Sequence, residues 1–139
     1  MSCEGLLVVH AVSTFAMVGL IWFVQVVHYP MLARHAGEGF GEVEREHCNR
    51  TGFVAAPLML VEVMTAALLM IGGFNPPLFL LAVILLIGAW ISTFLLQVPC
   101  HKALLSGWNE EVHRRLVATN WIRTIIWTLR SFIMAFILV

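Results

Sequence analysis

Four long apolar segments alternate with polar connections along the chain, and their lengths predict membrane-spanning helices. A helix needs roughly 20 mostly apolar residues to cross a bilayer. Asn75-Pro76-Pro77 predicts a tight turn and Pro99 a helix end, because proline cannot continue a helix and restricts the residue before it. The pattern predicts a single all-α domain over residues 1–139, an integral membrane four-helix bundle. Its helices are expected at about 5–32, 53–72, 78–98 and 117–139.

The two longer connections carry most of the basic residues. They contain Arg34, Arg45 and Arg50 in the first and Lys102, Arg114 and Arg115 in the second, whereas the 73–77 turn and the N-terminal tail have none. Basic residues favour the cytoplasmic side of a membrane. We therefore expect both connections in the cytoplasm and both termini outside it. We also expect no cleaved signal peptide, because the N-terminus lacks positive charge and the first apolar segment is too long.

Both connections also show helical periodicity. Phe40, Val43 and His47 share one face in the first connection, opposite Glu38, Glu42 and Arg45. Trp108, Val112 and Leu116 share one face in the second. Such segments either lie in the membrane interface or extend the membrane helices into water, and the sequence leaves both interpretations open.

Composition supports a membrane protein and excludes several other classes. Of 139 residues, 60% are hydrophobic and 12% charged, whereas soluble domains average about 45–50% and 25%. This excludes disorder and argues strongly against a soluble enzyme. Eight basic residues balance eight acidic ones, so there is no basic footprint for nucleic acid. The three cysteines, Cys3, Cys48 and Cys100, are odd in number and irregular in spacing, which argues against a disulfide framework.

The two halves of the chain resemble each other. Gln25-x-x-His28-Tyr29-Pro30 is followed by Phe40 and Asn49-Arg50-Thr51, and Gln97-Val98-Pro99-Cys100-His101 by Trp108 and Asn120-Trp121-Ile122-Arg123-Thr124. Counterparts are separated by 68 to 73 residues. A duplicated hairpin would give a pseudo-two-fold axis along the membrane normal, and membrane proteins often place sites at such repeat interfaces. It would also place Gln25, His28, Gln97 and His101 at one depth.

Each predicted helix carries a polar stripe, which indicates a polar bundle interior, because polar groups avoid lipid. The four stripes are His10, Ser13, Thr14, Met17, Gln25 and His28; Thr51, Leu58, Glu62 and Thr65; Trp90, Thr93, Gln97 and His101; and Asn120, Arg123, Thr124, Trp127, Arg130 and Ser131. Trp90 and Trp127 either pack in the core or line a pocket for a flat ligand such as a quinone or porphyrin.

Two charges lie deep within the predicted membrane segments. Glu62 and Arg130 sit at similar depths, and an unpaired charge there costs at least about 2.5–3.5 kcal/mol. We therefore predict an intramembrane ion pair between them. The pair is either a static salt bridge or contains a protonatable carboxylate or anion site. Arg123 lies on the same face as Arg130 but nearer the interface, where it suits an anionic headgroup or ligand.

The histidines suggest a cofactor or metal site near the cytoplasmic end. His28, His47 and His101 should lie at one level and are the predicted metal ligands, because imidazole suits zinc, copper and iron. Two histidines on facing helices would also suit haem iron. Cys48 and Cys100 would permit a Cys2His2 set with His47 and His101, although the spacing matches no standard zinc motif.

The combination Trp22-x-x-Gln-x-x-His-Tyr-Pro30, Gln97-Val-Pro-Cys-His101 and Asn120-Trp-Ile-Arg-Thr124 resembles small uncharacterised bacterial four-helix membrane proteins, over essentially the whole chain. This resemblance implies a bacterial inner-membrane location and no function. A second resemblance covers only the first half. His10, Gly19-Leu20 and Pro57 are similar to haem-binding four-helix proteins of the membrane protoporphyrinogen oxidase and copper-resistance D types. That resemblance implies His10 as an iron ligand, but the lysine and arginines expected of the oxidase pattern are missing.

The sequence therefore predicts a small-ligand or cofactor site in the cytoplasmic half of the bundle, with haem b, a transition metal or a quinone-like molecule as the ligand. Its predicted residues are His10, Gln25, His28, Gln97, His101, Asn120 and Arg123. Redox chemistry is compatible with this set, but no catalytic motif such as a Gly-rich phosphate loop or HExxH is present. Two alternatives are a non-catalytic scaffold or accessory subunit and a proton-coupled transporter working as an oligomer. The expected partners are the bilayer and either a second copy or a larger membrane complex, with no nucleic acid.

Overall fold

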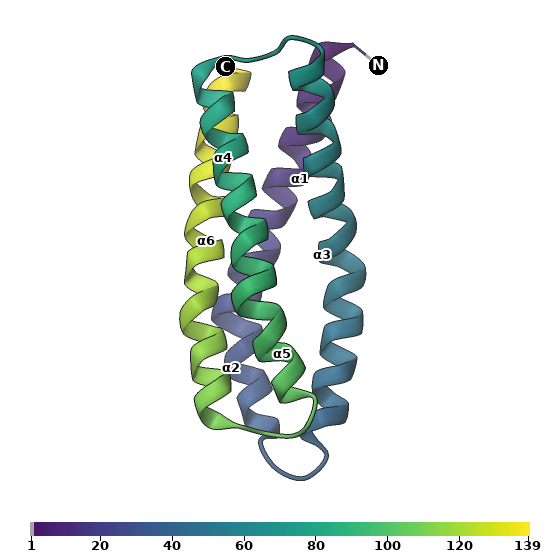
Figure 1. The fold of residues 1–139 in the computed structure, drawn as a ribbon, viewed down its shortest axis with the longest axis vertical. Coiled ribbons are helices and arrows are strands. Elements are labelled where there is room, and N and C mark those ends of the chain that lie inside the picture. Colours follow the sequence, from purple (N-terminus) through teal and green to yellow (C-terminus); the bar gives the residue numbers. More distant parts are fainter. Residues whose placement is uncertain (1) are drawn as a thin grey trace.

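The computed structural model describes residues 2–139 as four long antiparallel helices with both chain ends at one end of the bundle (Figure 1). The first helix comprises α1 (Cys3–Phe23), η1 (Val24–His28), α2 (Tyr29–Leu32) and η2 (Ala33–His35), and the second is α3 (Phe40–Ile71). The third comprises α4 (Pro77–Ser92), η3 (Thr93–Gln97) and α5 (Val98–Leu104), and the fourth is α6 (Glu110–Leu138). All four are long and apolar enough to cross a membrane. The predicted all-α four-helix bundle is confirmed.

The polar connections are mostly helix, so the bounds expected for the second and fourth helices were too short. α3 begins at Phe40 and α6 at Glu110, and neither is interrupted before its apolar part. Asn109 begins α6 because its side-chain oxygen accepts a hydrogen bond from the Val112 backbone N–H at 3.0 Å. Of the two interpretations of these segments, the structure therefore has helix extension rather than separate interfacial helices.

Pro99 does not end the third helix, contrary to expectation, because a wide turn accommodates it. Before Pro99 the Val98 N–H bonds to the Thr93 carbonyl, and before Pro30 the Tyr29 N–H bonds to the Val24 carbonyl. These are five-residue π-helical turns, which relieve the missing donor and the ring clash of the following proline. Both helices therefore continue beyond their prolines, to His35 and Leu104.

The two hairpins share local geometry at the separations expected of a duplication. The π-helical segments begin at Val24 and Thr93, 69 residues apart. The connections after them place Gly37 and Gly107, 70 residues apart, at backbone φ of 143° and 131°, which only glycine adopts readily. These separations fall within the range found from the sequence and support an internal duplication.

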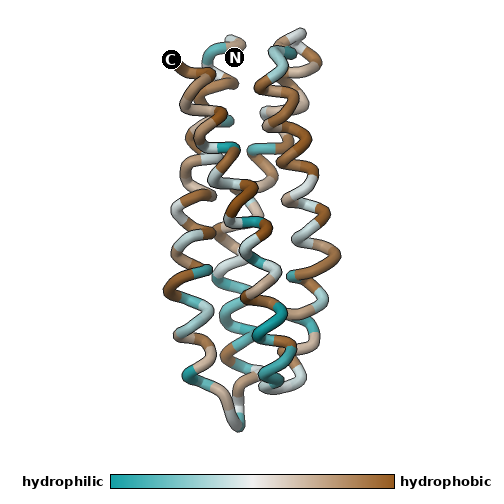
Figure 2. Tube along the Cα trace, turned by 90° about the vertical axis from the view of Figure 1, so that its left-hand side faces the viewer, coloured by the Kyte–Doolittle hydropathy of each residue, from teal (hydrophilic) through white to brown (hydrophobic). Residues whose placement is uncertain are grey.

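Exposed apolar residues mark where the bundle leaves the hydrocarbon layer. Large exposed apolar side chains begin at Phe53 on α3 and at Trp121 on α6, and none precedes them among residues 40–52 and 110–120. From Phe53 to Ile71 the helix rises about 27 Å, close to the roughly 30 Å thickness of a bilayer core. Figure 2 shows hydrophilic residues concentrated at the end opposite the termini. We call this end, which holds residues 28–52 and 97–120, the polar end.

The helix packing is uneven around the bundle. α1 packs against both α3 and α6, and α4 packs against α6. α3 and α4 stand apart over much of their apolar length, whereas α5 reaches α3 at the polar end (Figure 1). The core is divided into three apolar clusters along the bundle, with polar side chains between them.

Candidate metal centre and polar networks

A polar network surrounds Glu62 in the middle of the bundle. Arg130 Nη1 lies 2.5 Å from Glu62 Oε1, and neither side chain is exposed. The Thr14 hydroxyl donates to the same oxygen at 2.6 Å, and Trp127 Nε1 donates to Oε2 at 2.9 Å. Arg130 Nε also donates to the Ala82 carbonyl at 3.0 Å. The structure thus brings together the two residues that the sequence paired, and both carboxylate oxygens are satisfied.

His10 belongs to this central network and lies far from the other predicted cofactor residues. Thr65 Oγ1 donates its only hydrogen to the Val61 carbonyl at 2.6 Å. The same oxygen must therefore accept at its 2.8 Å contact with His10 Nδ1, which places the ring proton on Nδ1. His10 Nε2 then accepts from Arg130 Nη2 at 3.2 Å. Both ring nitrogens are thereby occupied, and His28 lies about 27 Å further along the helix. The arrangement does not favour His10 as a haem ligand.

A second network joins three of the predicted site residues. Asn120 Nδ2 donates to Gln25 Oε1 at 2.8 Å, and Arg123 Nη1 donates to Asn120 Oδ1 at 3.1 Å. Gln97 is not part of it: its side chain bonds to Ser92 at 3.1 Å and to Thr119 at 3.2 Å. Gln25 and Gln97 therefore share a level but hold different helices together.

His28, His47 and His101 lie close together at the polar end, as the sequence predicted. The rings of His28 and His47 stack with centroids 4.4 Å apart, and the His47 and His101 centroids are 5.2 Å apart. His113 reaches the same region, where its Nε2 lies 3.2 Å from the Tyr29 carbonyl. His35 is exposed and bonds only to the Met31 carbonyl of its own helix. Stacked rings at 4.4 Å leave no room for a porphyrin between His28 and His47, so the geometry does not favour haem there.

Glu44 is the residue of this cluster that the sequence analysis missed. Its side chain is fully buried, and Oε1 lies 2.5 Å from His101 Nδ1. The Cys48 thiol also points at Oε1, at 3.4 Å, whereas Oε2 is buried with no partner. The available signal was the spacing, because Glu44, His47 and Cys48 lie three and four residues apart and share one helix face.

Glu44, Cys48 and His101 form a candidate metal site. One ligand atom from each lies within 4.8 Å of the other two. Carboxylate oxygen, thiolate sulfur and imidazole nitrogen are the three ligand types that zinc uses in proteins. Of the predicted ligands His28, His47 and His101, only His101 belongs to this group, and His47 lies beside it.

Cys100 has a different role from the one considered in the Cys2His2 set. It is buried in the apolar cluster with Val24, Tyr29 and Leu32. All three cysteines are free, and Cys48 alone lies in the candidate site. The Cys2His2 set that the sequence permits does not form, because Cys100 packs in the apolar cluster whereas Cys48 and His101 meet at Glu44.

No protein-family model, characterised protein or solved structure matches this chain. The resemblances noted in the sequence therefore stay predictions.

Proposed function

We propose that the protein is an integral membrane protein of the bacterial inner membrane that binds a transition-metal ion at its polar end. The ligands are Glu44, Cys48 and His101, and zinc is the metal that this mixed set suits best. The basic residues of this end favour the cytoplasmic side, with both termini outside.

The observation that carries the proposal is the unpartnered oxygen of Glu44. Oε2 is buried and accepts no hydrogen bond, and the carboxyl has no exposed surface. A buried charge is costly unless it is paired and hydrogen-bonded, or coordinates a metal. His101 satisfies one oxygen only. A divalent cation between Glu44, Cys48 and His101 would satisfy the other.

The site needs a small adjustment to hold the ion. Two ligand atoms on one tetrahedral ion, each about 2.0–2.1 Å from it, are about 3.3 Å apart. Glu44 Oε1 and His101 Nδ1 lie closer than this, so metal binding would replace their hydrogen bond. Rotation of the carboxylate to present Oε2 would relieve this short contact. Three protein ligands then leave a fourth position for water or for another small ligand.

Cobalt titration tests the proposal, because Co²⁺ reports its ligands by colour whereas Zn²⁺ is spectroscopically silent. Adding Co²⁺ to the reduced, detergent-purified protein should give one equivalent of tetrahedral visible absorption and a thiolate charge-transfer band. Zn²⁺ should displace the bound Co²⁺ and so remove both absorption features.

Matched variants on the same chain make the test specific. Glu44→Gln and Cys48→Ser should weaken Co²⁺ binding at least about tenfold, in line with loss of one metal ligand. Glu46→Gln and Cys3→Ser are the controls, because both residues are exposed and lie outside the site. Helicity by circular dichroism establishes that each variant is folded. Absence of a thiolate band in the folded wild-type protein, or equal loss in Glu46→Gln, would refute the proposal.

A further inference from the structure

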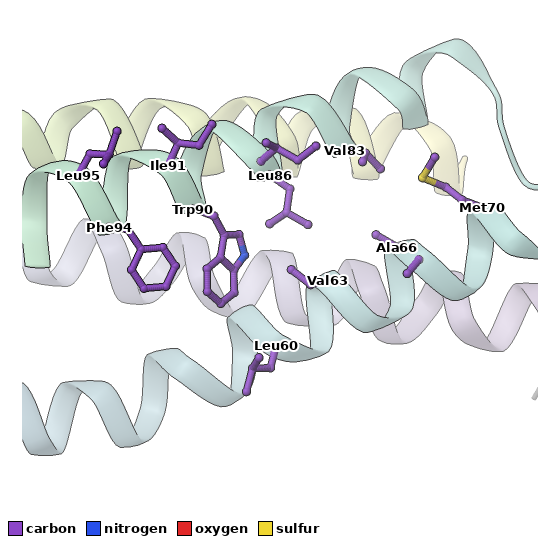
Figure 3. A pocket seen from close by; sticks show the side chains of 12 residues that line it. Leu60, Val63, Ala66, Met70, Val83, Leu86, Trp90, Ile91, Phe94 and Leu95 are labelled. Atoms are coloured by element: carbon purple, nitrogen blue, oxygen red, sulfur yellow. The ribbon is translucent and has the colours of Figure 1, made fainter.

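A groove separates α3 from α4 along their apolar parts. The internal duplication matches the first helix with the third and the second with the fourth, so the pair α3 and α4 corresponds to the pair α1 and α6. α1 packs against α6, whereas α3 and α4 stand apart. The groove encloses about 640 Å³ and is lined by apolar residues that include Val63, Leu86 and Trp90 (Figure 3). The open side of the groove faces the surrounding lipid, and Leu60 and Ile91 are exposed there.

The groove continues toward the polar end and becomes polar there. A second cavity of about 440 Å³ adjoins the first, because Trp90 and Phe94 line both. Thr51, Lys102 and Arg123 line this second part. The two adjoining cavities therefore give the groove a wholly apolar part and a part lined by two cationic side chains.

Arg123 lacks a counterion at the polar end of the groove. Its side chain is more than nine-tenths buried. Nη1 donates to Asn120 and the guanidinium lies 5.2 Å from the Trp127 ring, but Nε is buried without a partner. Among residues 2–139, no carboxylate lies within ion-pair distance of Arg123, whereas Arg130 has Glu62. An uncompensated buried cation is costly, so an anion is favoured here.

The depth of Arg123 suits a lipid headgroup. It lies two residues beyond Trp121, where the exposed apolar surface of α6 begins. Trp121 packs edge-to-face with Trp22 at 5.6 Å, and tryptophans favour this level of a membrane. Trp90 Nε1, also buried without a partner, adds a second free donor in the same groove. The two unsatisfied groups of the groove, Arg123 Nε and Trp90 Nε1, are both donors, which favours a ligand with acceptor oxygens.

We infer that the groove binds an anionic phospholipid, with its phosphate on Arg123 and Lys102 and one acyl chain along Trp90, Leu86 and Val63. The charge pattern favours this occupant over a second copy of the chain, because no exposed acidic residue of the membrane part would neutralise Arg123. Cys48 and His101 also line the second cavity. The inference does not require metal binding, since it is argued from Arg123, Lys102 and Trp90 alone.

Native mass spectrometry in detergent tests the inference. Phosphatidylglycerol should bind the wild-type protein with one preferred site and at least about fivefold more tightly than phosphatidylcholine, as expected for about 1 kcal/mol per basic residue. Arg123→Gln should remove this preference, whereas Arg115→Gln, at an exposed position of the same helix, should keep it. Arg123→Lys, which retains the charge, should restore part of the preference and shows that the position tolerates change.

The apolar part of the groove has its own variant and control. Ala67 lines the groove and is exposed, so Ala67→Phe should fill it and lower the affinity for phosphatidylglycerol without touching Arg123. Ala135→Phe, at an exposed alanine of α6 away from the groove, should have no effect. The inference would be overturned by equal binding of both lipids or by no effect of Arg123→Gln. It would also be overturned if an Ala67→Cys variant formed a cross-linked dimer. Each of these outcomes leaves the cobalt test of the metal site unaffected.

Discussion

Glu62 and Arg130 join diagonally opposite helices across the centre of the bundle. Glu62 lies on α3 and Arg130 on α6, and their side chains meet at 2.5 Å with no exposed surface. Thr14 and Trp127 complete the shell around the carboxylate. The two hairpins meet mainly where α1 packs against α6. The Glu62–Arg130 pair adds a direct link from α3 to α6. Its surroundings are those of a static structural pair rather than of a carboxylate open to water.

Removing one member of this pair should therefore destabilise the protein strongly. Glu62→Gln leaves Arg130 as an unpaired buried charge, and we expect a loss of about 3–5 kcal/mol in the free energy of unfolding. The double variant Glu62→Gln, Arg130→Met should recover part of that loss. Unfolding in mixed micelles monitored by circular dichroism measures both. Glu46→Gln breaks only the exposed pair with Arg50 and should cost less than about 1 kcal/mol.

The same variant separates the static pair from a transporter. If Glu62 carried protons, Glu62→Gln would abolish flux in proteoliposomes while leaving the fold stable. A stable Glu62→Gln variant without flux would contradict a purely structural role for the pair.

Two glycines of α3 should respond oppositely to alanine. A Cβ on Gly41 would lie 2.5 Å from the Leu105 carbonyl oxygen, so Gly41→Ala must push α3 away from the end of α5. Because Glu44 and His101 are held together by that approach, we expect lower stability and weaker Co²⁺ binding. Gly52 has open space around its Cβ position, and Gly52→Ala should stabilise the helix by about 0.5–1 kcal/mol. Thermal unfolding and cobalt titration of both variants provide the comparison.

Haem should not bind through the predicted histidines. His10 has both ring nitrogens hydrogen-bonded, and His28 and His47 stack too closely to admit a porphyrin between them. We expect no Soret band in the absorption spectrum of the gently purified protein. A Soret band that disappears in His28→Ala or His101→Ala would show that the cluster opens to accept haem.

Thiol labelling tests the proposed orientation. Cys3 is exposed near the N-terminus, and Ser106 is exposed in the connection at the polar end. In spheroplasts, a membrane-impermeant maleimide should label Cys3 in a variant lacking the other cysteines. A single cysteine introduced by Ser106→Cys should react only after the membrane is permeabilised. The reverse pattern would place the polar end outside the cytoplasm.

Apolar length and polar periodicity were enough to predict four helices and the inner face of each. Glu62 and Arg130 could be paired because two opposite charges at one depth in an apolar bundle have few other partners. The repeated Gln, His and Pro positions likewise indicated the duplication, which the two π-helical turns support. These features depend on local pattern and on the high cost of polar groups in lipid, so they can be predicted from the sequence alone.

Only the tertiary structure decided which inner residues meet. It placed His10 with Arg130 rather than with the other histidines, and it placed Glu44 rather than Cys100 beside His101. Periodicity assigns a residue to a helix face, but the rotation and vertical shift between helices decide its neighbours. The π-helical turn before Pro99 changes that rotation by a fraction of a turn, and the separation of α3 from α4 depends on packing around the whole bundle. Neither the rotation nor the separation can be predicted from the spacing of residues along a single helix.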